Sequence, residues 1–364
     1  MDRNVRSTGC NPILCHRQHY LCIAFVILIV FASGCSPYTR ELMWENKFRP
    51  TPYEKPAYEV DVEQWSNEDV TYAWLGHASV LINFYGTLIV TDPVLLRRIG
   101  PPEVFDNIFG IRRVLQLPMD IEHFPDIDVA LISHPHFDHL DLASLRYLNN
   151  RTDYTLIVPV SNRELIDEDI AGVIELDWKS RSGGSVDSGD VSISAFRVEH
   201  YGYADWGERD SKRGFNGYLI TSNNAGKNES KTVAFFGDTS YSRYRDEQGD
   251  VLAKPQSIDW RSRFDASVLE DGIDLCIIPI GDSYYYWNHI SPENALRLAR
   301  EINCKKMLPM HYSTFILTPA RHQPVKPKDT LLQLLETTST EMIECHSTTG
   351  EMRYPDVGLA CTLQ

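Results

Sequence analysis

The chain has 364 residues, of which 43% are apolar, and its 50 acidic residues outnumber its 35 basic ones, for a formal net charge of −15. The apolar content is typical of a folded globular protein and excludes a disordered chain. Because nucleic-acid binding depends on neutralising phosphates with Lys and Arg, this charge argues against a nucleic-acid partner. It also argues against retention on an anionic membrane by charge alone.

Residues 1–35 have the pattern of an export signal. Three arginines precede an apolar run from Leu21 to Ala32. As a helix this run spans about 18 Å, short of the roughly 30 Å hydrocarbon core, and therefore fits a signal peptide better than a membrane span. Small residues then lead to Cys35, in a pattern that resembles a bacterial lipoprotein signal with a lipidated cysteine. We expect a membrane-anchored lipoprotein of the bacterial cell envelope, facing the periplasm or the exterior; an uncleaved signal anchor is the alternative.

The remainder divides into two parts. Residues 36–68 are rich in Pro, Tyr and Glu without a clear period, which predicts a tether and an N-terminal arm, and residues 69–364 are expected to form the folded domain. The cysteines of this domain form no C-x-x-C pair, so a cysteine-based zinc site is not expected. Cys276, in the apolar run DLCIIPI, is interpreted as a small core residue. A disulfide is compatible with export, but the sequence does not specify one.

Strand patterns begin at Thr71. Between Thr71 and Pro93, apolar runs punctuated by Gly76 and Gly86 predict three consecutive strands. Further short apolar runs, DIDVALISH, YTLIVPV, KTVAFFGDTS, GIDLCIIPIGD and KKMLPMH, predict buried strands later in the chain.

Helices are predicted between these strands. Residues 140–150 carry leucines near helical spacing, and a polar helix is expected over 161–172. The segment 291–302 has Ser291 as a helix-capping residue followed by proline and glutamate in the first turn. A last helix is expected near 331–337.

A faint internal repeat indicates the fold class. DIDVALISHPH resembles GIDLCIIPIGD, and TLIVTDP resembles VAFFGDT; each is an apolar strand that ends in polar groups. Two similar halves, each a sheet with helices on one side, give an α/β four-layer αββα sandwich. Polar clusters at strand ends are where such folds bind ligands.

The strongest chemical signal is a cluster of metal-binding side chains directly after a predicted strand. His134, His136, Asp138 and His139 fall within the sequence HPHFDH. Imidazole and carboxylate groups are the ligands expected for catalytic zinc with an open coordination position. Three further candidates follow at other strand ends, in FRVEH, FFGDTS and KKMLPMH: His200, Asp238 and His311.

These motifs resemble those of the metallo-β-lactamase superfamily. A shared carboxylate suits two metal ions about 3.5–4 Å apart, and such a pair activates water near neutral pH. The resemblance implies two zinc ions per chain, with His134, His136 and His200 binding the first, Asp138, His139 and His311 binding the second, and Asp238 bridging both.

Three more residues are candidates for roles beside the metal ligands. In the superfamily an acid at the position of Asp92 orients a ligand histidine, although Asp92 before Pro93 also fits a simple turn. His77 either supports the ligands or is a satisfied buried histidine. His289, in an aromatic segment before a helix, is expected in the active-site wall. The catalytic candidates are Asp138, Asp238 and His289.

A closer resemblance covers most of residues 70–325. The elements GHAS, TDP, HISPEN and HYSTFIL resemble the branch of N-acylphosphatidylethanolamine-hydrolysing phospholipases D. That branch commonly has a His-Trp-Ser-x-Arg turn bordering the substrate, where this chain has His200-Tyr201-Gly202-Tyr203, with Trp206 and Arg209 further on. The run Tyr284–Trp287 either lines an acyl-chain entry or packs as core.

The resemblance implies a zinc phosphodiesterase that acts on a phospholipid or another small phosphodiester, held near the membrane by its N-terminal lipid. A lactonase or other carboxyl-ester hydrolase on the same metal site is one alternative. A non-catalytic surface lipoprotein that binds metal or a partner is another, which the complete ligand set argues against. The oligomeric state is not specified.

Overall fold

The computed structural model describes residues 52–100, 110–179, 185–188, 191–202, 213–222, 231–246, 251–281, 289–317, 327–336, 342–348 and 352–363. The signal segment with Cys35, the loop from Tyr203 to Arg209 and the run Tyr284–Trp287 lie outside these residues. Among the described residues, no helix is both long and apolar enough to cross a membrane. The division into an arm and a folded domain at residue 68 stays a prediction.

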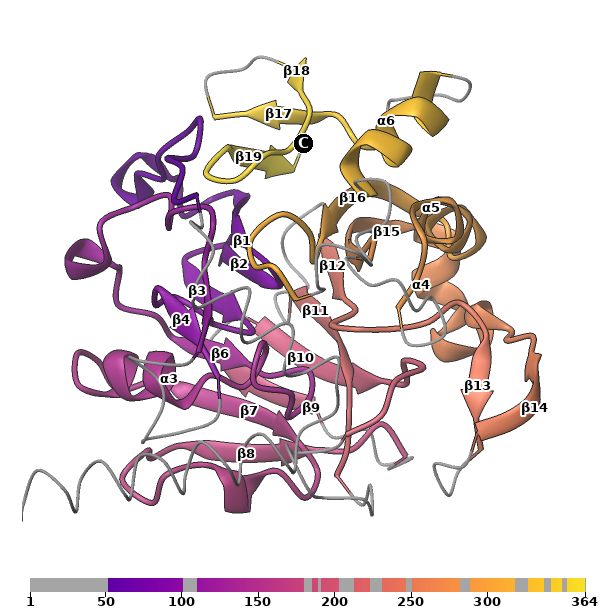
Figure 1. The fold of residues 1–364 in the computed structure, drawn as a ribbon, viewed down its shortest axis with the longest axis horizontal. Helices are drawn as coiled ribbons and strands as arrows, with labels where there is room; N and C mark the ends of the chain where they lie inside the picture. The colour runs from indigo at the N-terminus through magenta and orange to yellow at the C-terminus, as the bar shows by residue number, and fades with distance from the viewer. Residues whose placement is uncertain are drawn as a thin grey trace, which may run out of the picture.

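Two sheets form the middle of the molecule (Figure 1). The first has nine strands in the order β18-β17-β19-β1-β2-β3-β6-β7-β8, with β3, β6, β7 and β8 parallel. Its strands are β1 (Val70–Gly76), β2 (Ser79–Phe84), β3 (Thr87–Thr91), β6 (Val129–Leu131), β7 (Thr155–Pro159), β8 (Val173–Leu176), β17 (Cys345–Ser347), β18 (Met352–Arg353) and β19 (Ala360–Leu363).

The second sheet has six strands in the order β16-β15-β12-β11-β10-β9, of which β12, β15 and β16 are parallel. Its strands are β9 (Ser185–Ser188), β10 (Val191–Phe196), β11 (Gly217–Ser222), β12 (Thr232–Phe235), β15 (Ile273–Pro279) and β16 (Cys304–Met310). Two small hairpins complete the described strands: β4 (Arg98–Ile99) with β5 (Ile111–Arg112), and β13 (Arg243–Arg245) with β14 (Val251–Gln256).

The alternation of side chains along the strands explains why helices cover the sheets. In β1, Tyr72 and Trp74 pack into the core between the sheets, while Ala73 and Leu75 belong to a second core on the opposite face. Successive side chains of a strand point to opposite faces, so a strand that is apolar throughout requires cover on both sides. Helices provide that cover, with α3 (Leu142–Asn149) on the first sheet and α5 (Pro292–Glu301) on the second (Figure 1). The expected αββα sandwich is confirmed.

The helix ends follow their capping residues. The side chain of Asp141 accepts a hydrogen bond from the Ser144 N–H at 3.1 Å at the start of α3, and Ser291 does the same for Asn294 at 3.3 Å in α5. Among the described residues, the remaining helices are α4 (Ala266–Asp271) and α6 (Pro327–Glu336), with short 3-10 turns η1 (Val62–Gln64), η2 (Ile121–His123), η3 (Arg163–Leu165) and η4 (Trp260–Arg263).

The polar helix expected over 161–172 is wrong. Only the three residues of η3 are helical, and Ile166 is already extended. Asp167 instead forms an ion pair with Arg146 of α3, with 2.5 Å between the Arg146 Nε and the Asp167 Oδ2. The acidic residues 167–169 would also lie near the C-terminal end of such a helix, where the helix dipole disfavours negative charge.

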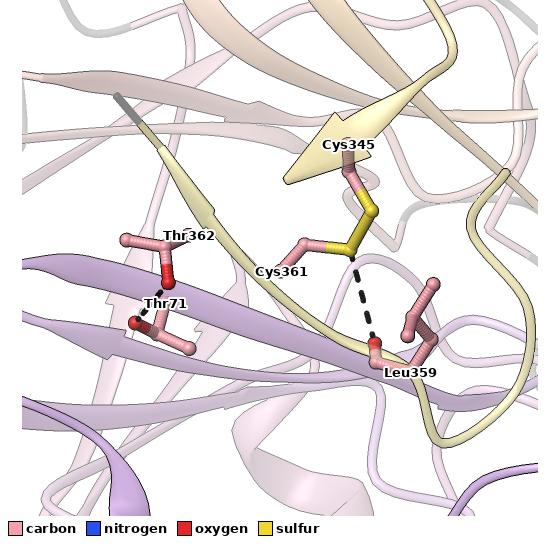
Figure 2. Close-up of a disulfide and its surroundings, with 5 residues drawn as sticks. All are labelled: Thr71, Cys345, Leu359, Cys361 and Thr362. Carbon is pink, nitrogen blue, oxygen red and sulfur yellow. Dashed lines mark hydrogen bonds between the residues drawn. A yellow bond between two sulfur atoms is a disulfide. The ribbon is translucent and has the colours of Figure 1, made fainter. Parts of the chain in front are cut away.

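Two disulfides link neighbouring strands, and one corrects the interpretation of Cys276. Cys276 is fully buried, but it is bonded to Cys304 of β16 rather than packed as a free thiol. The second joins Cys345 of β17 to Cys361 of β19 (Figure 2). Beside it, the Thr362 hydroxyl lies 3.3 Å from that of Thr71, where β19 pairs with β1.

Replacing Cys345 and Cys361 by serine should lower the free energy of unfolding by about 3 kcal/mol, because a crosslink over a loop of this length restricts the unfolded chain. The two cysteines are 16 residues apart in sequence. Urea-induced unfolding of wild type and double variant measures the difference. Thr362→Val, on the same strand, is the control and should cost no more than roughly 1 kcal/mol. An unchanged unfolding midpoint in the double variant would contradict this prediction.

Candidate metal centre

The candidate residues meet at one edge of the two sheets. Asp92 follows β3, His134 follows β6, and Asp238 follows β12. Carboxyl ends of parallel strands lie at the same edge of a sheet, which explains why residues far apart in sequence converge. The same region receives His77 after β1, His136, Asp138 and His139 after β6, His200 after β10, His289 before α5 and His311 after β16.

Their ligand atoms form two clusters joined by one carboxylate. In each cluster the imidazole nitrogens and carboxylate oxygens lie within 4.8 Å of one another. Asp238 belongs to the first and also forms a third group with His289 and His311, which connects the two. The first contains His134, His136, His200 and Asp238, and the second contains His77, Asp138, His139 and His311.

Asp92 fixes the orientation of one histidine in each cluster. Its Oδ2 lies 2.6 Å from the Nδ1 of His139 and accepts the hydroxyl hydrogen bond of Ser133, also at 2.6 Å. Since Ser133 has given its only hydroxyl proton to Asp92, its oxygen accepts from the Nδ1 of His134 at 2.9 Å. Both rings therefore turn their Nε2 atoms toward the clusters, as a metal ligand requires.

The first cluster is ready to coordinate a cation. Burial lowers the pKa of His134 and of His200 well below the usual histidine range and that of His136 to about 4. The three imidazoles are therefore neutral near pH 7, and each has a lone pair to offer. The Nε2 of His134 lies 2.8 Å from the Nδ1 of His136 and 3.9 Å from the Oδ2 of Asp238.

The second cluster holds protons where a metal ion would bind. Burial opposes charge, yet the carboxylates of Asp238 and Asp138 raise the pKa of His139 well above its usual value and also raise that of His311. In turn His311 and His139 hold the pKa of Asp238 well below its usual range, although burial acts to raise it. A metal ion would displace these protons, so its affinity should fall as the pH falls.

A buried carboxylate oxygen indicates that the residues fit a cation. The Oδ1 of Asp238 makes no well-aligned hydrogen bond, although the His311 Nε2 lies 3.1 Å from it. A buried polar atom without a well-aligned partner is costly. A divalent ion would satisfy this oxygen, and imidazole with carboxylate is a ligand set that zinc accepts. The Nδ1 of His289 lies 3.5 Å from the Oδ2 of Asp238.

His77 and His289 occupy different surroundings within the centre. The Nε2 of His77 lies 3.0 Å from the Oδ2 of Asp138, and its backbone carbonyl accepts from the His311 N–H at 2.9 Å. His77 therefore supports residues of the second cluster through both ring and backbone. The side chain of His289 is 17% exposed, so solvent and substrate can reach it.

Two supporting residues were not predicted from the sequence. Ser133 carries the bond between Asp92 and His134, and its only signal was a hydroxyl next to a candidate ligand. Glu199 accepts from Arg243 at 3.2 Å and from Arg263 at 2.9 Å, while its carbonyl accepts from the Ser240 N–H at 2.9 Å. It thereby holds the segment of His200 against that of Asp238, through partners more than 40 residues away.

An αββα sandwich with histidine and aspartate clusters at its strand ends has the arrangement of a metal-dependent enzyme. Residues 88–312 match the family model described as a beta-lactamase superfamily domain. The chain belongs to the metallo-β-lactamase superfamily.

Curated relatives and solved structures agree with this assignment. The chain is 24% identical over 294 residues to the N-acyl-phosphatidylethanolamine-hydrolyzing phospholipase D 1 of Caenorhabditis elegans, covering 77% of this chain and 74% of the relative. It is 25% identical to the mitochondrial enzyme of the same name from Saccharomyces cerevisiae, covering 76% of this chain but only 54% of the relative.

Among solved structures, a possible metal-dependent hydrolase from Veillonella parvula has a TM-score of 0.54 at 14% identity, covering 81% of this chain and 100% of that one. A metallo hydrolase from Ignicoccus hospitalis has a TM-score of 0.50 at 16% identity, covering 81% and 98%. At these identities the likeness shows a shared fold.

Replacing Asp238 by Ala should lower the amount of divalent metal bound per chain, because both clusters lose the carboxylate they share. Metal per chain is measured by mass spectrometry of digested protein after dialysis. Asp274→Asn is the matched control. It changes a buried aspartate at the opposite end of the same strands, where the carboxylate accepts from the Thr232 N–H at 2.8 Å. Unchanged metal content in the Asp238 variant would refute the shared-ligand arrangement.

Proposed function

We propose that the chain is a binuclear zinc phosphodiesterase whose substrates are phospholipids. The observation that carries the proposal is the pair of clusters joined by Asp238. The first cluster has the residues expected for one ion, His134, His136 and His200, and the second has those expected for the other, Asp138, His139 and His311.

A pair of zinc ions, when bound, supplies water activation and Lewis-acid stabilisation of phosphoryl oxygens. The chain's own residues determine where that chemistry occurs. Asp92 orients His139 directly and His134 through Ser133. Asp138, which contacts His77, and Asp238 supply the negative charge, and His289 faces the accessible side of Asp238. His289 is therefore placed to donate a hydrogen bond to a developing oxyanion.

The phospholipid substrate is supported by the relatives, whose names specify N-acyl-phosphatidylethanolamine hydrolysis. A carboxyl ester or lactone is the second candidate, because the residues beside the first cluster depart from the pattern of the branch. The branch's Trp is Tyr201 in this chain, and its ring stacks on His200 with 4.8 Å between centroids and lies 5.1 Å from the His136 ring. The wall of the first cluster therefore differs from the family pattern where substrate would approach.

A phospholipid in mixed micelles should be hydrolysed faster than a short soluble phosphodiester, because acyl-chain burial adds binding energy. Replacing His289 by Ala should lower kcat by roughly 10²-fold while leaving metal content unchanged, if His289 acts in the transition state. Steady-state kinetics with zinc-loaded protein measure both effects.

The control substrate is an acyl lactone at matched concentration, and the control variant is His123→Ala, an exposed histidine paired only with Asp120 in the described contacts. Turnover of the lactone with none of the phospholipid would replace the phosphodiesterase proposal by the lactonase one. Loss of metal from the His289 variant would make His289 a ligand instead of a donor.

We further infer that the protein is exported and anchored by lipid at Cys35. The two disulfides support an oxidising compartment, since such bonds are rare in the cytosol. A tether to the membrane would bring the metal centre close to phospholipid substrates.

Labelling with a radioactive fatty acid in a bacterial host should mark the wild-type chain and not Cys35→Ser, because the thiol of Cys35 is the proposed attachment point. Autoradiography of purified protein provides the measurement, and Cys22→Ser, within the proposed signal, should label like wild type. Equal labelling of wild type and Cys35→Ser, or none of either, would leave the segment as a plain signal or an anchor helix.

A further inference from the structure

Arg113 is a fully buried cation behind the metal centre, with 1% of its surface exposed. Its guanidinium donates to three backbone carbonyls: from Nε to Leu115 at 2.7 Å, from Nη1 to Val94 at 2.8 Å, and from Nη2 to Leu75. No carboxylate is among these acceptors. Burial lowers the pKa of Arg113 to about 10, which leaves it charged near neutral pH.

The segments held by this guanidinium are those that carry residues of the metal centre. Leu75 stands two residues before His77, and Val94 stands two residues after Asp92. The backbone of Arg113 also forms a bridge with Phe315, in the loop that follows His311.

Further bonds join these segments to one another. The His77 N–H donates to the hydroxyl of Thr314 at 2.7 Å, and the Thr314 carbonyl accepts from the Val114 N–H at 2.8 Å. The chain on both sides of Arg113 is therefore tied to the loop that presents His311.

The same segments hold unusual backbone conformations. His77, Asp92 and His311 have φ angles of 54°, 32° and 65°, in the left-handed region that non-glycine residues rarely adopt. Such conformations persist only where surrounding contacts hold them. Gly76 leaves room for the guanidinium of Arg113, since a Cβ at this position would lie 2.5 Å from the Arg113 Nη2.

We propose that Arg113 is a positioning residue for the second metal cluster, fixing the left-handed turns that present His77, Asp92 and His311. The inference rests on the proposed metal-dependent function. A guanidinium holds its donors on three nitrogens in a rigid planar fork, whereas a lysine ammonium has all three donors on one nitrogen at the end of a flexible stem. The first cluster is linked to Arg113 less directly, through Asp92 and Ser133.

The test measures zinc binding at each site in the full chain, with Arg113→Met and Arg113→Lys. Competition with a chelating dye gives the two affinities, and the visible spectrum of the cobalt-loaded protein reports ligand geometry. The more weakly bound zinc of each Arg113 variant should lose about 10- to 100-fold in affinity, as expected when a residue that orients ligands is removed. The cobalt spectrum of both variants should change.

The matched control is Arg151→Met, which removes another guanidinium that donates to backbone carbonyls, those of Glu122 and Phe124, both at 3.0 Å. It should keep both zinc affinities and the cobalt spectrum. If Arg113→Met does not fold, Arg113→Lys decides the question.

The possible failures are distinguishable. Wild-type affinities and spectrum in folded Arg113 variants would overturn the role of Arg113 while leaving the metal centre intact. An equal loss at both zinc sites, with the Arg151 variant unaffected, would overturn the selectivity for the second cluster. A wild-type chain that binds no zinc would overturn the proposed function itself.

Discussion

The metal centre depends on one carboxylate that is not itself in either cluster. Asp92 contacts the ring of His139 directly and that of His134 through the hydroxyl of Ser133, so one side chain sets the direction of a histidine in each cluster. A lone pair on the wrong nitrogen would point away from the clusters. The residue lies at the end of β3 beside the end of β6, where parallel pairing aligns Thr91 with Leu131. The register of β3 and β6 therefore determines where Asp92 lies relative to the candidate ligands after β6.

The strands can hold this register because both of their faces are buried. In β6, Val129 and Leu131 pack between the sheets while Ala130 packs toward the helix side. A slip by one residue would exchange the two faces and move every following ligand, so the two cores protect the site as well as the fold. The strands end in strained turns at His77 and His311. Rigid strands can hold such turns in place, and with them the charged and titratable side chains of the centre.

Where the signal is local, sequence reasoning names residues that the structure brings together. The cluster from His134 to His139 lies in consecutive residues, and Asp238 and His311 each end a recognisable apolar run. Sequence reasoning fails where the role of a residue depends on a partner far away in the chain. Ser133 contacts Asp92, which lies 41 residues away, and Arg113 contacts Leu75, which lies 38 residues away. The disulfides could not be predicted for the same reason, because the pairing of adjacent strands brings their cysteines together. The helix expected over 161–172 is absent, and its Asp167 forms an ion pair with Arg146, a partner that the local sequence does not reveal.

The charge of the centre bears on which substrate it favours. Asp92, Asp138 and Asp238 provide three negative charges, which two divalent ions would exceed by one positive charge, and buried Arg113 adds another close by. This would be a positive centre within a chain whose net charge is −15. In a buried site such a charge attracts an anion more strongly than it would in water. A phosphodiester carries one negative charge in its ground state and gains more toward the transition state, whereas a lactone is neutral until attacked. On this charge count, the proposed phosphodiester would be attracted to the loaded centre more strongly than a lactone.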